Sequence, residues 1–188
     1  MQAARGASLT PSDHVTSPDR RRRARQVFVI LVVTGLLIDQ GSKVWALAAL
    51  ADSDRALLGD WFTLHLVFNP GAAFSLGTEY TVVLTCLAIV AVGVILFLSR
   101  RLGSIFWAWG LGLLLAGVGG NLIDRVFRDP SPMRGHVVDF LRLPNWPVFN
   151  FADVFINVAA AIIIVQSFRG IALDGSRDTA AAKAEEQS

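Results

Sequence analysis

The sequence predicts an all-α membrane protein, a four-transmembrane-helix bundle with both termini in the cytoplasm. Its 188 residues are 53% hydrophobic and only 17% charged, whereas a soluble domain carries about a quarter of charged residues. The apolar residues fall in four long blocks, each near the roughly 20 residues that cross a bilayer. The arginines between the blocks are unevenly placed, and this asymmetry sets the orientation of the helices.

The four blocks are expected as helices at about 27–47, 80–98, 105–123 and 148–168. They lie in a single transmembrane domain that we place at 25–171. Residues 1–24 are expected to form a basic, disordered cytoplasmic tail and residues 172–188 a second one, because both ends are rich in small and polar residues. A cleaved signal peptide is the alternative for the first block, but its apolar region is longer than the usual 7–15 residues.

Arginines next to the blocks indicate which loops face the cytoplasm. They precede block one, join blocks two and three, and follow block four: Arg20–Arg25, Arg100, Arg101 and Arg169. The loop 48–79 has one cation against four acidic residues and belongs outside. Arg128, Arg134 and Arg142 oppose this orientation, but three agreeing sites outweigh them. With a net charge of only +2, we read the arginine cluster before block one as a topology signal and expect no nucleic-acid partner.

Three smaller features complete the predicted architecture. The segment 61–68 is aromatic and β-branched, which is typical of strands, here at the membrane surface. Small residues four apart on block three are expected to pack closely against another helix: Gly112, Ala116 and Gly120. The single cysteine, Cys86, is interpreted as inert packing.

Four aspartates lie in or at the outer end of the blocks, where ionisable groups are costly and point to function: Asp39, Asp124, Asp139 and Asp153. Asp39 has Lys43 on the same helical face, which favours a structural ion pair that supports the site. Asn121, Asp124 and Arg125 share another face. We expect them to form a hydrogen-bonded cluster in which Asn121 and Arg125 can hold the substrate backbone.

Asp139 and Asp153 differ because each is embedded in apolar sequence, without a cation at helical spacing toward its own apolar block. Arg142 follows Asp139 by three residues, but only a helix would make them neighbours, and Gly135, Pro144 and Pro147 argue against a helix there. Burial raises the pKa of a carboxyl, and two close carboxyls cannot both ionise cheaply. Such a pair shares a proton near neutral pH, which suits aspartic proteolysis: one carboxylate activates water while the other, protonated, donates to the carbonyl oxygen.

Asn150, Asp153 and Asn157 form a polar stripe on block four that should face protein or water. A helix N-cap is the alternative role for Asn150. The three histidines are not at ligand spacing, and no Gly-x-Ser-x-Gly motif occurs, so the sequence favours neither metal nor serine chemistry and no cofactor is expected.

Five segments occur in order along the chain: Asp39–Lys43, Asn69–Phe74, Gly119–Arg125, Gly135–Phe140 and Phe149–Asp153. With these segments the sequence resembles the lipoprotein signal peptidase (signal peptidase II) family. The resemblance implies four transmembrane helices with a small β-structured cradle and a short helix outside. It also implies a bacterial inner-membrane enzyme that removes the signal peptide of prolipoproteins before a diacylglyceryl-modified cysteine.

The resemblance assigns roles to ten residues. Asp139 and Asp153 are the expected catalytic pair. The expected substrate-binding residues are Asn69, Gly71, Asn121, Arg125 and Asn150. The expected supporting residues are Asp39, Lys43 and Asp124. The implied partners are lipid-modified prolipoproteins, membrane lipid and globomycin-type peptide inhibitors, with the enzyme expected as a monomer whose site faces the extracytoplasmic side.

Two departures and two alternatives remain. Ala116 stands where the family commonly has glycine, and the loop 127–135 is long for the family. A small proton-coupled transporter would also hold buried carboxylates, although the sequence lacks the internal repeat of many carriers. A non-catalytic scaffold would leave the burial of Asp139 and Asp153 unexplained. The loop near 68–74 is expected to close over the site.

Overall fold

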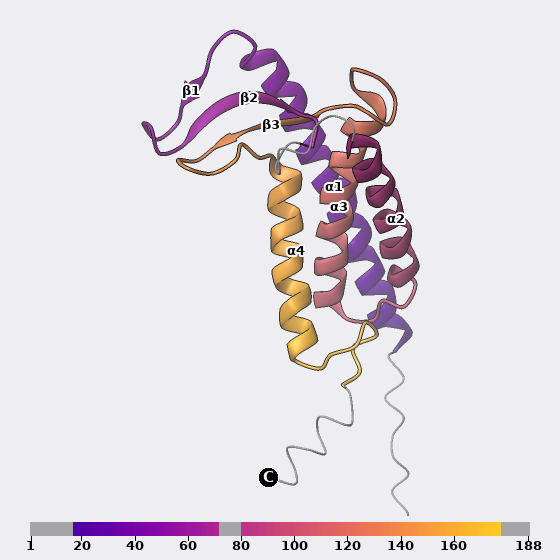
Figure 1. Cartoon of the computed structure of the whole chain (residues 1–188). Helices are drawn as coiled ribbons and strands as arrows, with labels where there is room; N and C mark the ends of the chain where they lie inside the picture. Colours follow the sequence, from indigo (N-terminus) through magenta and orange to yellow (C-terminus); the bar gives the residue numbers. More distant parts are fainter. Residues whose placement is uncertain (1–16, 72–79, 178–188) are drawn as a thin grey trace, which may run out of the picture.

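The structure is a computed structural model that describes residues 17–71 and 80–177. Within them the chain forms four helices and three short strands: α1 (Pro18–Ala49), β1 (Arg55–Ala56), β2 (Thr63–Asn69), α2 (Thr81–Ser99), α3 (Ile105–Phe127), β3 (Val137–Arg142) and α4 (Phe151–Phe168). Each helix is long and apolar enough to cross a membrane. They lie side by side as a bundle, with the strands at one end (Figure 1).

The ends of three helices differ from the sequence-based expectation. Helix α1 begins at Pro18, nine residues early, because Ser17 caps it and proline suits the first helical turn. Residues 18–24 are therefore helical, which corrects the disordered tail expected for 1–24. Helix α3 continues four residues past the apolar block because its last polar residues are bound within the protein. Helix α4 begins three residues late, at the capping box that Asn150 forms with Asp153.

The segment after α4 also corrects a predicted boundary. Residues 172–177 were expected in a disordered tail, but they fold back against the start of α3. The carbonyl oxygen of Leu173 accepts hydrogen bonds from the backbone nitrogens of Gly103 and Ser104 at 3.0 and 3.1 Å. Residues 178–188 lie outside the described part of the chain.

Helix α3 packs against each of the other three helices. Its small residues allow this, as predicted: a Cβ added at Gly112 would lie 3.0 Å from the Leu31 Cβ on α1, and Ala116 lies directly against Gly35. Cys86 differs from its interpretation as a buried packing residue, because on α2 it is exposed on the outside of the bundle.

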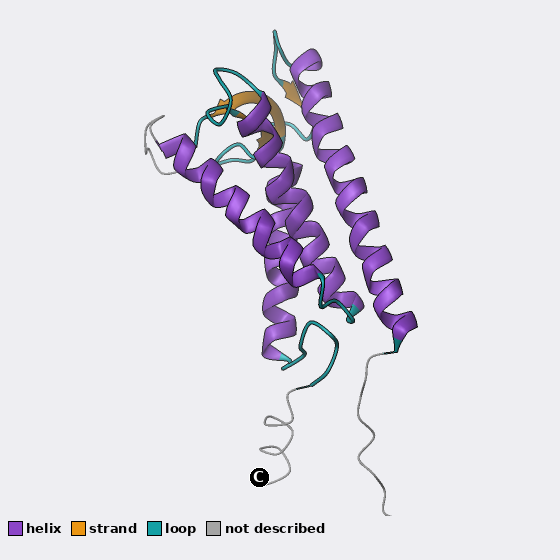
Figure 2. Cartoon of the chain, turned by 90° about the vertical axis from the view of Figure 1, so that its right-hand side faces the viewer, coloured by secondary structure: helices purple, strands orange, loops and turns teal. Residues whose placement is uncertain are grey.

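The strands form one antiparallel sheet in the order β1-β2-β3. It lies at the end of the bundle opposite the start of α1 and the end of α4 (Figures 1 and 2). The strand predicted at 61–68 is thus confirmed as β2, shifted by one or two residues. A small apolar cluster joins the sheet to the end of α1: Ala46, Leu50, Leu64, Phe140 and Leu141.

Two further features concern this end of the molecule. Trp45, Trp61 and Trp146 are 45%, 76% and 65% exposed, as side chains in an interfacial aromatic belt should be. The short outer helix implied by the family resemblance is not found in the described residues 50–71 and 128–150.

Candidate active site

Asp139 from β3 and Asp153 from the first turn of α4 are brought together by Asn150. The Asn150 Nδ2 atom donates to Asp139 Oδ1 at 2.6 Å. The Asn150 backbone N–H donates to Asp153 Oδ2 at 3.1 Å, and the Asn150 Oδ1 atom accepts from the Asp153 backbone N–H. Asn150 is fully buried. Asn150 therefore caps α4, the alternative role considered for it, and also holds both aspartates.

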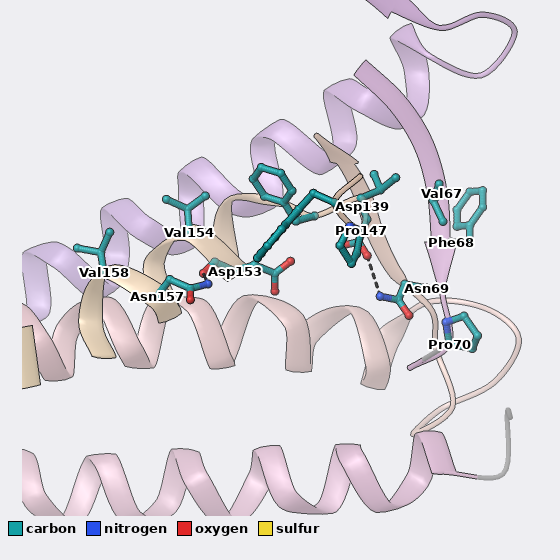
Figure 3. Close-up of a pocket in the computed structure, with 13 residues that line it drawn as sticks. Val67, Phe68, Asn69, Pro70, Asp139, Pro147, Asp153, Val154, Asn157 and Val158 are labelled. Atoms are coloured by element: carbon teal, nitrogen blue, oxygen red, sulfur yellow. Dashed lines mark hydrogen bonds between the residues drawn. The ribbon is translucent and has the colours of Figure 1, made fainter. Parts of the chain in front are cut away.

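Asn69 approaches Asp139 from the other side, across the sheet (Figure 3). Asn69 pairs with Val137 in the β2–β3 register, so Asp139 lies diagonally opposite on the same face of the sheet. The Asn69 Nδ2 atom donates to Asp139 Oδ2 at 2.8 Å, and its Oδ1 accepts from the Gly71 backbone N–H at 2.8 Å. Both oxygens of Asp139 are thus held by asparagine amides.

Gly71 is required by the geometry of this turn. Its φ is +113°, a conformation that side chains disfavour, and an added Cβ would lie 2.6 Å from the Leu84 Cδ1 atom. The glycine therefore allows β2 to turn toward α2 beside the site. The last three residues of the loop expected to close over the site, 72–74, lie outside the described residues.

Asn121 on α3 holds Asp153. Its Nδ2 donates to Asp153 Oδ1 at 2.9 Å. Its Oδ1 accepts from Lys43 Nζ at 3.0 Å and from Asn150 Nδ2 at 3.1 Å. Because both of these partners are donors, the amide oxygen must face them, and the amide nitrogen is left facing the carboxylate.

A buried ion network lies beneath the two aspartates. Lys43 Nζ pairs with Asp39 Oδ2 at 2.9 Å and with Asp124 Oδ2 at 2.8 Å, and all three side chains are fully buried. This confirms the ion pair predicted from the spacing of Asp39 and Lys43. A desolvated cation is tolerated here because two carboxylates and an amide oxygen surround it.

Each carboxylate of the network also holds one of the segments that carry the paired aspartates. Asp39 Oδ1 accepts from the Ala152 backbone N–H at 3.0 Å, next to Asp153 on α4. Asp124 Oδ2 accepts from the Val138 backbone N–H at 3.3 Å, next to Asp139 on β3. The network therefore fixes where the two aspartates stand relative to each other.

The structure divides the cluster that was expected from the shared face of Asn121, Asp124 and Arg125. Asn121 and Asp124 are joined through Lys43, as described above. Arg125 instead reaches the other side of the site, where its Nη1 atom lies 3.5 Å from the Pro70 carbonyl oxygen. These two directions differ because adjacent residues on a helix, here Asp124 and Arg125, project about 100° apart.

Sequence reasoning missed two members of the network. Gln40 Nε2 donates to Asp39 Oδ2 at 3.0 Å and to the Gly120 carbonyl at 3.1 Å. Arg128 Nε lies 2.6 Å from Asp124 Oδ1. Two signals were available: a polar glutamine inside an apolar block, and an arginine four residues after an aspartate.

The electrostatic environment of Asp139 favours its protonated form. Its side chain is 2% exposed, and this burial raises the pKa of Asp139 to about 7, helped by the nearby Asp153 and opposed by the hydrogen bonds from Asn69 and Asn150. Near neutral pH the protonated form of this carboxyl is therefore accessible.

Two hollows meet at the paired aspartates. A groove of about 840 Å³ runs between the end of β2, the loop before α4 and the α4 surface, where Val154 and Val158 form its wall. A smaller hollow of about 300 Å³ lies between α2 and α3 and is lined by Gly71, Asn121 and Arg125, among others. Asn69, Asp139 and Asp153 line both, so a chain crossing from one to the other passes the two carboxyls.

No group of three or more histidine, cysteine, aspartate or glutamate side chains within residues 17–71 and 80–177 is arranged to hold a metal ion. The side chains of the site described so far are carboxyls, amides, one lysine and two arginines, Arg125 and Arg128.

The family model of signal peptidase (SPase) II matches residues 30–169, which include every residue of this site. The chain belongs to the signal peptidase II family. Membership in it makes the chain a protease and a multi-pass bacterial membrane protein. The match confirms the family that the five sequence segments indicated, and all five segments lie within the matched residues.

Several lipoprotein signal peptidases are close relatives. The chain is 43% identical to the one from Mycobacterium leprae, with 89% of this chain and 84% of the relative covered. It is 45% identical to the one from Mycobacterium tuberculosis (84% and 78%) and 40% identical to the one from Streptomyces coelicolor (85% and 80%). A bacterial membrane enzyme solved by the in meso method at 2.3 Å has the same fold, with a TM-score of 0.66 at 22% identity over 76% of this chain and 88% of that one.

Proposed function

We propose that this protein is an intramembrane aspartyl endopeptidase that removes the signal peptide from prolipoproteins, cutting before the diacylglyceryl-modified cysteine. The observation that carries the proposal is the pairing of Asp139 and Asp153 through Asn150 beside a groove open along α4. Two carboxyls on separate elements, held by a shared partner, are the equipment of aspartic proteolysis. The lipoprotein signal peptidases to which the chain is similar support the choice of substrate.

In the proposed reaction a water molecule lies between the two carboxyls. The ionised one takes a proton from the water as its oxygen attacks the scissile carbonyl carbon, and the protonated one donates to the carbonyl oxygen. The resulting tetrahedral intermediate collapses when the peptide nitrogen accepts a proton and the C–N bond breaks. The proton at rest belongs to the pair, and the raised pKa of Asp139, about 7, supports its availability at neutral pH.

The substrate backbone needs polar partners, because a carbonyl left unsatisfied in lipid is costly. We assign this role to four residues that line the smaller hollow: Asn69, Gly71, Asn121 and Arg125. Asn150, also expected to bind substrate, is fully buried and bound to Asp139, Asp153 and Asn121, so its role is to hold the aspartates. The diacylglyceryl chains would lie along Val154 and Val158, the apolar wall of the larger groove. Val158 is 44% exposed on the bundle surface, which supports lateral entry of the substrate from the bilayer.

Orientation, inhibition and assembly complete the proposal. The start of α1 and the end of α4 lie at one end of the bundle and the site at the other. With the arginines near the first end in the cytoplasm, the site faces the extracytoplasmic side. A cyclic peptide of the globomycin type would occupy the same groove. The enzyme would act as a monomer, because one chain supplies both aspartates.

A proton-coupled transporter remains the alternative that buried carboxylates suggest. Family membership does not favour it. A transporter would also need the aspartates to change partners during transport, whereas asparagines hold both of them from two sides.

A gel-shift cleavage assay tests the proposal. Purified protein in detergent is mixed with a diacylglyceryl-modified prolipoprotein, with and without a metal chelator. Wild type should cleave it in both conditions, and Asp139→Asn and Asp153→Asn should each abolish cleavage. Asp52→Asn, which removes an exposed aspartate of the outer loop, is the matched control and should cleave normally.

The variants also separate failure of chemistry from failure of folding. Each one must first show the elution profile and thermal transition of wild type. A folded Asp139→Asn protein with near-normal cleavage would overturn the assignment of the pair. A folded wild type that cleaves nothing would overturn the proposed function.

A further inference from the structure

The first two turns of α1 carry an excess of positive charge at the amino-terminal end of the helix, where cations are unfavourable. Arg20–Arg23 and Arg25 are all exposed, and the only acidic residue in the first turn is Asp19. The amino-terminal end of a helix is the positive end of its dipole and disfavours cations. Like charges three or four residues apart, such as Arg21 and Arg25, repel each other as well.

Asp174, after α4, acts electrostatically on Arg21, but none of these arginines forms an ion pair within 4.0 Å in the described part of the chain. Its five ion pairs of 4.0 Å or less all lie elsewhere, around Lys43, Asp54 and Asp124. Arg25 donates only to a backbone oxygen, that of Arg100, at 3.4 Å. An external anion would relieve both the dipole and the mutual repulsion.

One face of α1 combines these cations with an apolar surface. A hollow of about 890 Å³ along this face is lined by residues spaced three and four apart: Pro18, Arg21, Arg22, Arg25, Gln26, Val29 and Ile30. Val29 and Ile30 are 54% and 60% exposed, and the exposed Val33 continues the apolar stripe up the helix. On this face the guanidinium groups lie nearest the amino-terminal end of α1, and the aliphatic side chains follow them along the helix toward the membrane core. This arrangement matches a molecule with an anionic head and a hydrocarbon tail.

The depth of the arginines agrees with such a molecule. At 1.5 Å per residue the 32 residues of α1 extend about 48 Å, whereas the hydrocarbon core is about 30 Å thick. With the outer end of α1 at one boundary, the core ends near Phe28. The backbones of Arg25 and Arg22 then lie about 5 and 9 Å beyond it. Their long side chains therefore reach the headgroup region, which is about 5–7 Å deep on each side.

We propose that this face of α1 is a binding site for an anionic phospholipid of the leaflet at that end of the bundle. Arg22 and Arg25 hold the phosphodiester, with Arg21 beside them, because guanidinium forks match phosphate oxygens. Val29 and Ile30 contact the first part of an acyl chain. The site is at the opposite end of the bundle from the aspartates and is independent of the proposed function.

The test measures lipid binding and thermal stability of the full chain in detergent. Arg22→Gln/Arg25→Gln is compared with Arg20→Gln/Arg23→Gln, which removes the same charge from the other side of the helix, since successive residues project about 100° apart. Phosphatidylglycerol, phosphatidylcholine and inorganic phosphate are the three probes. Bound lipid is counted by native mass spectrometry, and the thermal midpoint is read by fluorescence.

For wild type, phosphatidylglycerol should bind and raise the thermal midpoint, while phosphatidylcholine and inorganic phosphate should not. Each surface arginine is worth about fivefold in affinity for anionic lipid, so Arg22→Gln/Arg25→Gln should lose roughly 30-fold and Arg20→Gln/Arg23→Gln should stay close to wild type. Equal losses in both would mean a diffuse charge effect and would overturn the site. No loss in either, or an equal effect of inorganic phosphate, would also overturn it.

Discussion

The Asn150 side-chain amide lies 2.6 Å from the Asp139 carboxylate, while the same residue caps the helix that carries Asp153. One residue therefore sets the spacing of the two carboxyls and begins α4. These two roles use different atoms: Oδ1 caps the helix, and Nδ2 binds Asp139 and Asn121. They can be separated by substitution.

Asn150→Ser should retain the cap and lose the amide donor. Serine is as good an N-cap as asparagine, so the part of the stability that the cap supplies should be kept. Cleavage should fall about tenfold or more, because the buried Asp139 loses a hydrogen bond of the charge-assisted kind. Asn150→Ala, the comparison variant, should lose the same activity and a further ~1 kcal/mol of stability. Equal stability of the two variants would show that the cap contributes nothing.

Lys43→Met should destabilise the fold strongly. It leaves Asp39 buried with no cation partner and Asp124 with only Arg128, and removing one partner of a buried ion pair typically costs about 3–5 kcal/mol. Thermal unfolding in detergent measures the change. Arg142→Met, which breaks the exposed pair with Asp54 at 3.9 Å, is the control and should cost less than about 1 kcal/mol. Similar losses in both variants would contradict the role given to Lys43.

Gly120→Ala and Gly119→Ala form a matched pair on α3. A Cβ at Gly120 would collide with the Asp39 carboxylate, whereas a Cβ at Gly119 would lie 3.6 Å from Leu36 Cδ2, an ordinary contact. Gly120→Ala should therefore displace Asp39 and lower both thermal stability and cleavage. Gly119→Ala should leave both unchanged or slightly improve stability, because alanine favours helix by about 1 kcal/mol over glycine. The reverse order would show that Gly120 is not needed for close packing.

The raised pKa of Asp139, about 7, predicts two pH effects. The first is on activity: if the pair must hold one proton, cleavage should decline as pH rises through about 7, since Asp139 then loses that proton. An alkaline limb in the pH profile of kcat/KM measures it. A rate that stays constant from pH 6 to 9 would contradict a protonated Asp139 in the reaction.

The second pH effect is on stability. Between the ordinary pKa of 3.8 and the raised value of about 7, the folded protein holds a proton that the unfolded chain has released. The free energy of unfolding should therefore fall as pH rises through this window, by up to about 4 kcal/mol in total. Asp139→Asn cannot titrate, so its thermal midpoint should change less between pH 5 and pH 8 than that of wild type. Parallel pH profiles for the two proteins would argue against burial as the cause of the shift.

The sequence by itself determined the helices, the family and the ion pair of Asp39 and Lys43. Lipid imposes a simple requirement, because a span needs about 20 apolar residues, and a charge inside one needs a partner, here four residues away on the same face. Strand β2 was visible for a similar local reason, its aromatic and β-branched composition. The roles proposed for Asp139 and Asp153 rest on their apolar surroundings and on the resemblance.

Only the tertiary structure decided how these residues meet. The bridge from Asn150 to Asp139 spans two elements, and Asp39 reaches the backbone of Ala152, 113 residues away. It also decided the cationic partners of Asp124, which are Lys43 and Arg128, while Arg125, next to Asp124 in the sequence, projects to the other side of the site. Spacing along one helix predicts a shared face, but a hydrogen-bond partner on another element depends on how the elements pack, and that information is not local in the sequence.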